Sequence, residues 1–301
     1  MQKPKIVYVS LQVLIALIHL NFLYAQDNIR IEEGHHEERP HFIIHTPLAT
    51  YYYDKAGGGF SRMMDQEGND WISFKKEPWN EYPASAASSY RGLPNLVFRS
   101  EDDGAGHPGF DQCISFKKRN DQIVTESKSG KWRWRWTFYK DHAVLQIEKI
   151  DPQQPYWFLY EGTPGGKYAP QHYYFGYDSK DSTLIGPTIQ LPDLSKGTAS
   201  FGQYRWMYTG HQQVEGVLYM LQLKADGHTD LISYMGNSDQ GVNSKDGMTV
   251  FGFGRGPQTQ ALLTEPQSFV IGFYSHSIQN QEEYEQLAKE LNQLIQKYTK
   301  H

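Results

Sequence analysis

The chain has 301 residues, with 29 Lys and Arg against 34 Asp and Glu, and a formal net charge of −5. This acidic balance opposes binding to nucleic acid or to an anionic membrane surface, because both are negatively charged. The only cysteine is Cys113, so no intramolecular disulfide bond can form. Because Cys113 lies in a strand-like run, we expect it to be a small buried apolar residue rather than a nucleophile.

The N-terminus has the three regions of an export signal in order. Lys3 and Lys5 precede an apolar run over residues 6–23, and Ala25 is followed by polar residues. This pattern predicts a signal peptide over residues 1–25. The run is also close to the minimum length of a membrane anchor, but Ala25 ahead of a polar stretch favours cleavage. We therefore expect a periplasmic or secreted protein with no membrane contact after cleavage.

Residues 26–40 are charged and rich in histidine, and they lack clear strand or helix signals. This composition predicts a flexible lead-in. The remaining residues, 41–301, suit one domain, since all-β domains of this length are commonly single.

Between residues 41 and 276, short runs of β-branched and aromatic residues alternate with Gly, Asn, Asp and Pro clusters. This alternation is typical of antiparallel strands joined by turns. The clearest predicted strands cover residues 41–45, 143–147, 216–223 and 268–273. The sequence thus predicts an all-β, antiparallel β-sandwich.

Only the C-terminus has the periodicity of a helix, with apolar residues three or four apart from Tyr284 to Tyr298. This spacing predicts a helix over residues 281–299, with Asn280 and Glu283 forming a capping box at its start. We expect its single apolar stripe to pack on the β domain, and partner binding is the alternative.

The run Trp132-Arg133-Trp134-Arg135-Trp136 alternates strictly, so on a strand the indoles share one face and the guanidiniums the other. Two interpretations follow. The indole face is either a platform for sugar rings, with Trp134 binding substrate, or it is buried in the sandwich behind two outward-facing arginines.

The segment 53–65, followed by residues 68–72, contains a glycine-rich turn, a strand, an Asp-x-x-Gly turn and an aromatic run. It resembles the early hairpin of galactose-mutarotase-like β-supersandwich proteins, and residues 265–273 resemble the last long strand of that superfamily. The runs 90–95, 107–110 and 160–166 are similar to secreted polysaccharide-utilisation proteins, including dehydratases and lyases that act on uronic acids of ulvan. The resemblance implies an acidic oligosaccharide or polysaccharide as the partner.

The aromatic content points to the same ligand class. The chain has 21 Tyr and 7 Trp. Their side chains combine an apolar ring with a polar tip, which suits stacking on sugar rings with hydrogen bonds at the rim. We therefore predict a carbohydrate ligand.

Elimination from a uronate requires a cation or amide donors on the carboxylate, a base for the adjacent C–H proton and an acid for the leaving oxygen. Four segments beside turns contain the expected Arg, His and Tyr side chains. The predicted catalytic residues are His107 or His172 as the base and Tyr173 or Tyr208 as the acid. The predicted substrate-binding residues are Arg91, Asn95, Lys167, Arg205, His211 and Trp134, with Arg91 and Arg205 on the carboxylate. No spacing marks a metal site, and no cofactor is expected.

Two other functions remain open at this point. A glycoside hydrolase needs two carboxylates across a cleft. Glu161 is the best candidate for one of them, and the possible partners are Asp111, Glu215 and Asp230. A non-catalytic glycan-binding protein is the third possibility.

Overall fold

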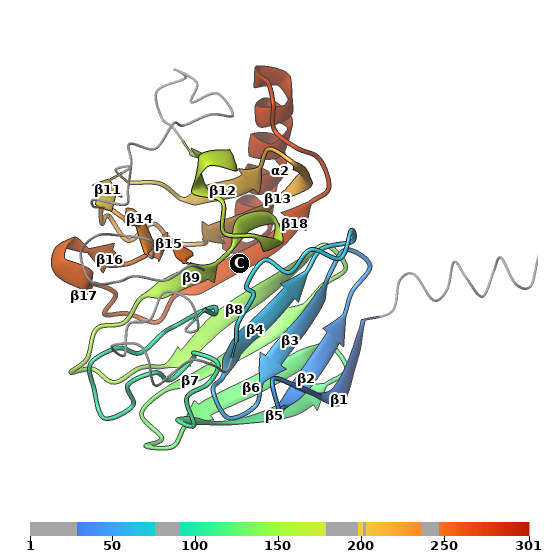
Figure 1. Cartoon of the computed structure of the whole chain (residues 1–301). Coiled ribbons are helices and arrows are strands. Elements are labelled where there is room, and N and C mark those ends of the chain that lie inside the picture. The colour runs from blue at the N-terminus through green and yellow to red at the C-terminus, as the bar shows by residue number, and fades with distance from the viewer. Residues whose placement is uncertain (1–28, 76–90, 179–197, 201–202, 236–246, 301) are drawn as a thin grey trace, which may run out of the picture.

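The computed structural model describes residues 29–75, 91–178, 198–200, 203–235 and 247–300 (Figure 1). The predicted signal peptide lies outside these residues. The strands are β1 (Arg30–His36), β2 (Arg39–His45), β3 (Thr50–Asp54), β4 (Gly59–Met64), β5 (Cys113–Arg119), β6 (Gln122–Ser127), β7 (Arg133–Phe138), β8 (His142–Lys149), β9 (Phe158–Gly162), β10 (Tyr173–Tyr177), β11 (Thr198–Ser200), β12 (Trp206–His211), β13 (Val214–Gln222), β14 (Leu231–Met235), β15 (Met248–Phe253), β16 (Arg255–Gly256), β17 (Gln260–Ala261) and β18 (Ser268–Tyr274). The predicted all-β class is confirmed, and the C-terminal segment forms a long helix, α2 (Gln281–Thr299).

One large sheet carries two smaller ones. It has eight strands in the order β10-β12-β13-β18-β8-β7-β6-β5. The four-stranded sheet β1-β2-β3-β4 covers the β5–β8 half, and the four-stranded sheet β11-β14-β15-β9 lies over the other half (Figure 1). Ring pairs join the layers: Phe60 lies 4.8 Å from Trp136, and Phe158 stacks on Phe269 at 4.3 Å. The two halves therefore share one continuous aromatic core.

The alternating Trp/Arg run forms β7 and the end of the turn before it, and its indole face is buried. Trp134 is 1% exposed, and its Nε1 donates a hydrogen bond to the Tyr53 hydroxyl at 3.0 Å. Arg133 and Arg135 lie on the opposite face and form ion pairs with Glu148. The sugar-platform interpretation is therefore wrong, and Trp134 belongs to the core because both layers of the sandwich close over it.

Cys113 is buried in the same core. Burial raises the pKa of its thiol to about 12, so the expectation of an unreactive apolar residue fits the structure.

The predicted lead-in is corrected by the structure from residue 30 onward. Residues 30–36 form β1, which pairs with β2 in antiparallel register from Arg30↔His45 to His36↔Arg39. The sequence pattern missed this strand because β1 is an edge strand in which only Ile31 is fully buried. Its pairing is set by the hairpin with β2 rather than by an alternating apolar pattern.

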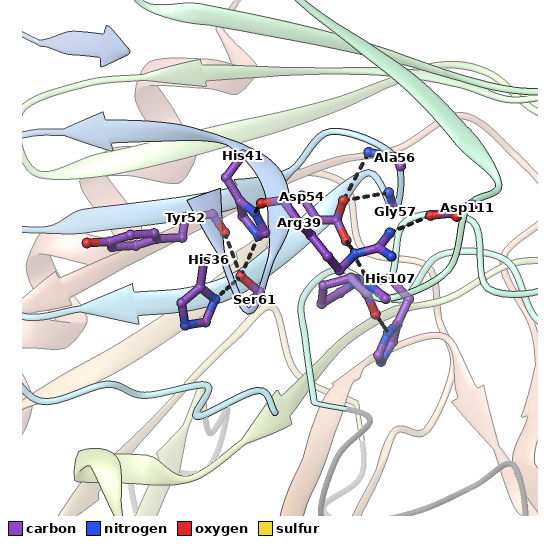
Figure 2. Close-up of polar contacts among 12 residues, drawn as sticks. His36, Arg39, His41, Tyr52, Asp54, Ala56, Gly57, Ser61, His107 and Asp111 are labelled. Carbon is purple, nitrogen blue, oxygen red and sulfur yellow. Dashed lines mark hydrogen bonds and ion pairs between the residues drawn. The ribbon is translucent and has the colours of Figure 1, made fainter. Parts of the chain in front are cut away.

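Two histidines from this hairpin share one serine (Figure 2). The Ser61 hydroxyl lies 2.9 Å from His36 Nδ1 and 2.8 Å from His41 Nε2. His41 Nδ1 lies 2.7 Å from the Arg39 carbonyl oxygen, which can only accept, so this nitrogen carries the hydrogen. Burial lowers the pKa of His36 to about 4, and the neighbouring His41 lowers it further. Burial also lowers the pKa of His41, and the charges of Arg39 and His35 act in the same direction.

These depressed pKa values predict acid sensitivity. Between the ordinary histidine pKa of 6.5 and about 4, the unfolded chain binds protons that folded His36 does not, so stability falls as the pH is lowered. Arg62 adds to this effect, and Asp54 opposes it. We expect the urea midpoint to drop between about pH 7 and about pH 5, with a smaller drop for His36→Asn. If the urea midpoints of the wild-type and His36→Asn proteins fall by the same amount, His36 is not the cause of the acid sensitivity.

Helix α2 begins as predicted. The Asn280 side chain accepts from the Glu283 backbone N–H at 3.1 Å, and the Glu283 carboxylate accepts from the Asn280 N–H at 3.2 Å, which makes a capping box. Its buried face, Leu287, Leu291 and Ile295, packs on the outer face of the eight-stranded sheet, so the expected docking is confirmed. Within the part of the chain that the structure describes, no helix is long and apolar enough to span a membrane.

Candidate functional site

A cavity of about 370 Å³ lies against the β9 and β15 strands. Alternation along β9 creates its floor, because Phe158 and Tyr160 point into the core while Leu159 and Glu161 point to the other face. Val250 of β15 stands directly opposite Glu161 and lines the same cavity. The floor is therefore an apolar sheet surface with one buried carboxylate.

The loop from Asn95 to Phe110 forms the facing wall and brings in His107. It lies directly on the glycine-rich turn between β3 and β4. The Gly106 N–H donates to the Gly57 carbonyl at 2.9 Å, and a Cβ on Gly57 would lie 2.4 Å from the His107 carbonyl oxygen. Only glycine permits this approach. The glycine-rich turn between β3 and β4 thus positions His107.

Asp54, at the end of β3, ties this turn to the His107 loop (Figure 2). Its Oδ1 accepts from the Gly57 N–H at 3.1 Å, and its Oδ2 accepts from the Gly109 N–H at 2.9 Å. Arg39 Nε donates to the same Oδ2 at 2.6 Å. The Asp54 side chain is fully buried, so we infer that this carboxylate fixes the loop next to His107.

We expect Asp54→Asn to lower the free energy of unfolding by about 3 kcal/mol, because the new amide presents N–H groups to donors. The matched control is Asp111→Asn. Asp111 also accepts from Arg39, but its side chain is 67% exposed, so its loss should cost below about 1 kcal/mol. Urea denaturation measures both free energies of unfolding. Equal losses for the two variants would show that Asp54 does not hold the loop more strongly than the exposed Asp111.

Within the cavity, His107 and Glu161 form a buried pair. His107 Nε2 lies 3.0 Å from Glu161 Oε2, and Asn95 Nδ2 donates to Glu161 Oε1 at 2.7 Å. His107 Nδ1 lies 2.7 Å from the Pro108 carbonyl oxygen, so Nδ1 carries a hydrogen. Nε2 and the carboxylate oxygen are therefore placed to pass a proton between them. Such a pair can both take up and release a proton.

Arg255 supplies positive charge to the same cavity. It is 4% exposed and donates a hydrogen bond to the Ser233 hydroxyl of β14. Ser233, Val250 and Glu161 stand opposite one another across three neighbouring strands, so Ser233 is about 10 Å from Glu161 on the same face. Burial lowers the pKa of the Arg255 guanidinium, and the Glu161 carboxylate opposes that shift. The guanidinium and the carboxylate thus line one cavity and interact electrostatically.

Of the predicted site residues, the structure brings His107 and Asn95 together in this cavity, with Glu161 from the hydrolase alternative. Arg91 is fully buried and donates to the carbonyls of Ser73 and Gly247. Its predicted role in binding a substrate carboxylate is therefore corrected to a structural one.

Tyr208 and Arg205 are also displaced from their predicted roles. Tyr208 lies in the cluster under α2, with its ring 6.4 Å from that of Tyr284. Arg205 donates to the Leu223 carbonyl at 2.6 Å. Neither lines the cavity. Tyr208 lies in β12 on the helix side of the large sheet, and Arg205 directly precedes that strand.

Four more predicted residues form a separate group at the β10 and β12 ends. The His211 ring lies 5.5 Å from that of His172 and 5.7 Å from that of Tyr173. The Tyr173 hydroxyl donates to the Lys167 carbonyl. The sequence placed Lys167, His172 and Tyr173 in one candidate segment and His211 in another. None of the four lines the cavity.

The predicted hydrolase partners of Glu161 lie elsewhere as well. Asp111 and Glu215 are exposed, and Asp230 is buried and accepts from the Gly254 N–H at 2.7 Å. Burial raises the pKa of Asp230 to about 8. Asp103 does line the cavity, and its Oδ1 accepts from the Arg99 N–H at 2.9 Å.

Sequence reasoning missed Arg255 and Phe98, which line the cavity. The available signal for Arg255 was Gly254-Arg255-Gly256-Pro257, a charged residue between glycines directly after a buried apolar strand. No comparable signal marked Phe98.

No protein-family model matches the chain, and no curated protein matches it in sequence. Among solved structures, the chain is similar to the protein HI1317, with a TM-score of 0.51, 8% identity and coverage of 81% of this chain and 96% of that one. A galactose mutarotase-like protein from Lactobacillus casei has a TM-score of 0.47 and 7% identity over 78% of this chain and 100% of its own. A polysaccharide lyase has a TM-score of 0.30 and 9% identity over 85% of this chain and 33% of its own. At these identities the match to HI1317 shows a shared fold alone.

Proposed function

We propose that this protein is a carbohydrate-active carbon–oxygen lyase that acts on oligosaccharides containing uronic acids, such as ulvan fragments. The observation that carries the proposal is the cavity that combines the His107–Glu161 pair with a buried cation, Arg255. Elimination needs this combination, because the cation acidifies the C–H bond next to the carboxylate.

In the proposed reaction the sugar carboxylate faces Arg255. The His107–Glu161 pair takes the proton from the carbon next to the carboxylate. The C–H electron pair becomes the new C=C bond, and the C–O bond on the next carbon breaks. The pair then returns a proton to the leaving oxygen, so it ends as it began.

The remaining walls fit a sugar. Phe98, Phe110 and Trp157 line the cavity, and Phe98 stacks on Trp157 at 4.8 Å. Aromatic faces bind the apolar C–H surfaces of sugar rings. The volume of about 370 Å³ is in the usual range of small-molecule sites.

Hydrolysis is the second candidate, since Asp103 gives the cavity another carboxylate. Asp103 is exposed and holds the Arg99 backbone, whereas an inverting or retaining pair must flank the scissile bond. We therefore favour elimination. The predicted export signal supports action in the periplasm or outside the cell.

The test is to incubate the purified protein with uronic-acid oligosaccharides, following the ultraviolet absorbance of an unsaturated uronate and the product masses. Loss of water indicates a dehydratase, and chain cleavage with new absorbance indicates a lyase. Both outcomes support elimination. Cleavage with gain of water indicates a hydrolase, and binding without any product indicates a glycan-binding protein. Either of these outcomes overturns the proposal.

A further inference from the structure

A second groove of about 450 Å³ adjoins the cavity. Phe98 and Thr259 line both spaces, so these two residues form the boundary between them. The groove continues over residues 154–155 and 257–261. The cavity and the groove are therefore immediate neighbours, as the binding sites of two linked sugars must be.

The groove has its own cation. Arg99 is exposed, and its guanidinium lies 4.8 Å from the Phe98 ring centroid. Its only hydrogen bond to a described residue is made by its backbone N–H, to Asp103. The guanidinium thus keeps its N–H donors available while the aromatic ring holds it at the boundary.

The backbone of this groove is held in an unusual conformation. Arg99, Gln258 and Thr259 have φ values of 58°, 57° and 58°, a region that non-glycine residues rarely adopt. Such conformations cost free energy and are concentrated at ligand-binding sites. Two separate chain segments, one between β4 and β5 and one between β16 and β17, contribute them to one groove.

We propose that this groove binds the neighbouring sugar of an acidic oligosaccharide whose reacting residue occupies the His107 cavity. The Arg99 guanidinium recognises an anionic group on that sugar, since its planar N–H pairs match a carboxylate or a sulfate. Side-chain amides in the groove, such as that of Gln258, hydrogen-bond to the hydroxyl groups of that sugar. The inference rests on the proposed function and makes its substrate an oligomer with charge on adjacent units.

The test compares Arg99→Ala with wild-type protein in calorimetric binding and in kcat/KM. The ligands are a monomeric uronate, an unsulfated oligouronate, a sulfated neutral oligosaccharide and an uncharged oligosaccharide. We expect about tenfold weaker binding of the charged oligomers and no change for the monomer, as expected for loss of one charge-assisted contact. The oligouronate and sulfated arms identify the recognised anion. The control is Arg119→Ala, an exposed arginine outside the groove.

Unchanged binding of both charged oligomers to Arg99→Ala, with wild-type protein still active on the oligouronate, overturns the proposed role of the groove and leaves the proposed function standing. Equal weakening for the monomer or for the uncharged oligomer also overturns that role, because the effect would then be general. If wild-type protein neither binds nor converts any uronate, the proposed function itself fails, and the groove fails with it.

Discussion

His107→Gln and Glu161→Gln should each lower kcat for elimination by about 10²-fold to 10⁴-fold, the usual contribution of a positioned acid or base. Each change replaces one of the two titratable groups that meet at the 3.0 Å contact between His107 Nε2 and Glu161 Oε2 with an amide that cannot take up a proton. Steady-state kinetics on a uronate oligosaccharide gives the rates. Circular dichroism and the urea midpoint check that the fold is intact.

The matched control is His172→Gln. His172 was an equal candidate for the base in the sequence, but it lies near His211 and outside the cavity. We expect it to keep the wild-type rate. A slow His172→Gln protein together with a fully active His107→Gln protein would show that the reaction takes place beside His172 and His211, at the ends of β10 and β12.

Trp134→Ala should destabilise the protein by about 3–5 kcal/mol, because a large buried ring is removed from a packed core. Trp134 is 1% exposed between the two layers of the sandwich. Arg135→Ala, on the opposite face of the same strand, should cost no more than about 1 kcal/mol. Denaturant unfolding distinguishes the two.

A milder variant separates packing from sugar binding. Trp134→Phe keeps a ring but loses the hydrogen bond to Tyr53, so we expect about 1–3 kcal/mol lower stability and unchanged affinity for oligosaccharide. Weaker sugar binding with full stability would restore the platform interpretation.

The sequence predicted the local elements well where periodicity is strong. Helix α2 and the strand β18 follow from apolar spacing and cap residues that act within a few positions. It missed β1, whose only fully buried side chain is Ile31. An edge strand with one buried residue carries no period from which to predict it.

The site was predictable only in part, for a physical reason. His107 stands among glycines in a predicted loop, where a core histidine is unusual, and this setting marked it as a candidate site residue. The roles of Arg91 and Arg255 depend instead on which sheet face each side chain meets. That is fixed by pairing between distant strands, such as β15 with β9, and residue type alone does not encode it.

The most direct test of the central claim is a crystal structure of the Glu161→Gln protein with a bound uronate oligosaccharide. We predict electron density for the sugar in the cavity, with its carboxylate on Arg255 and the reacting C–H bond facing His107. Density beside His172 and His211, with the cavity empty, would contradict the account.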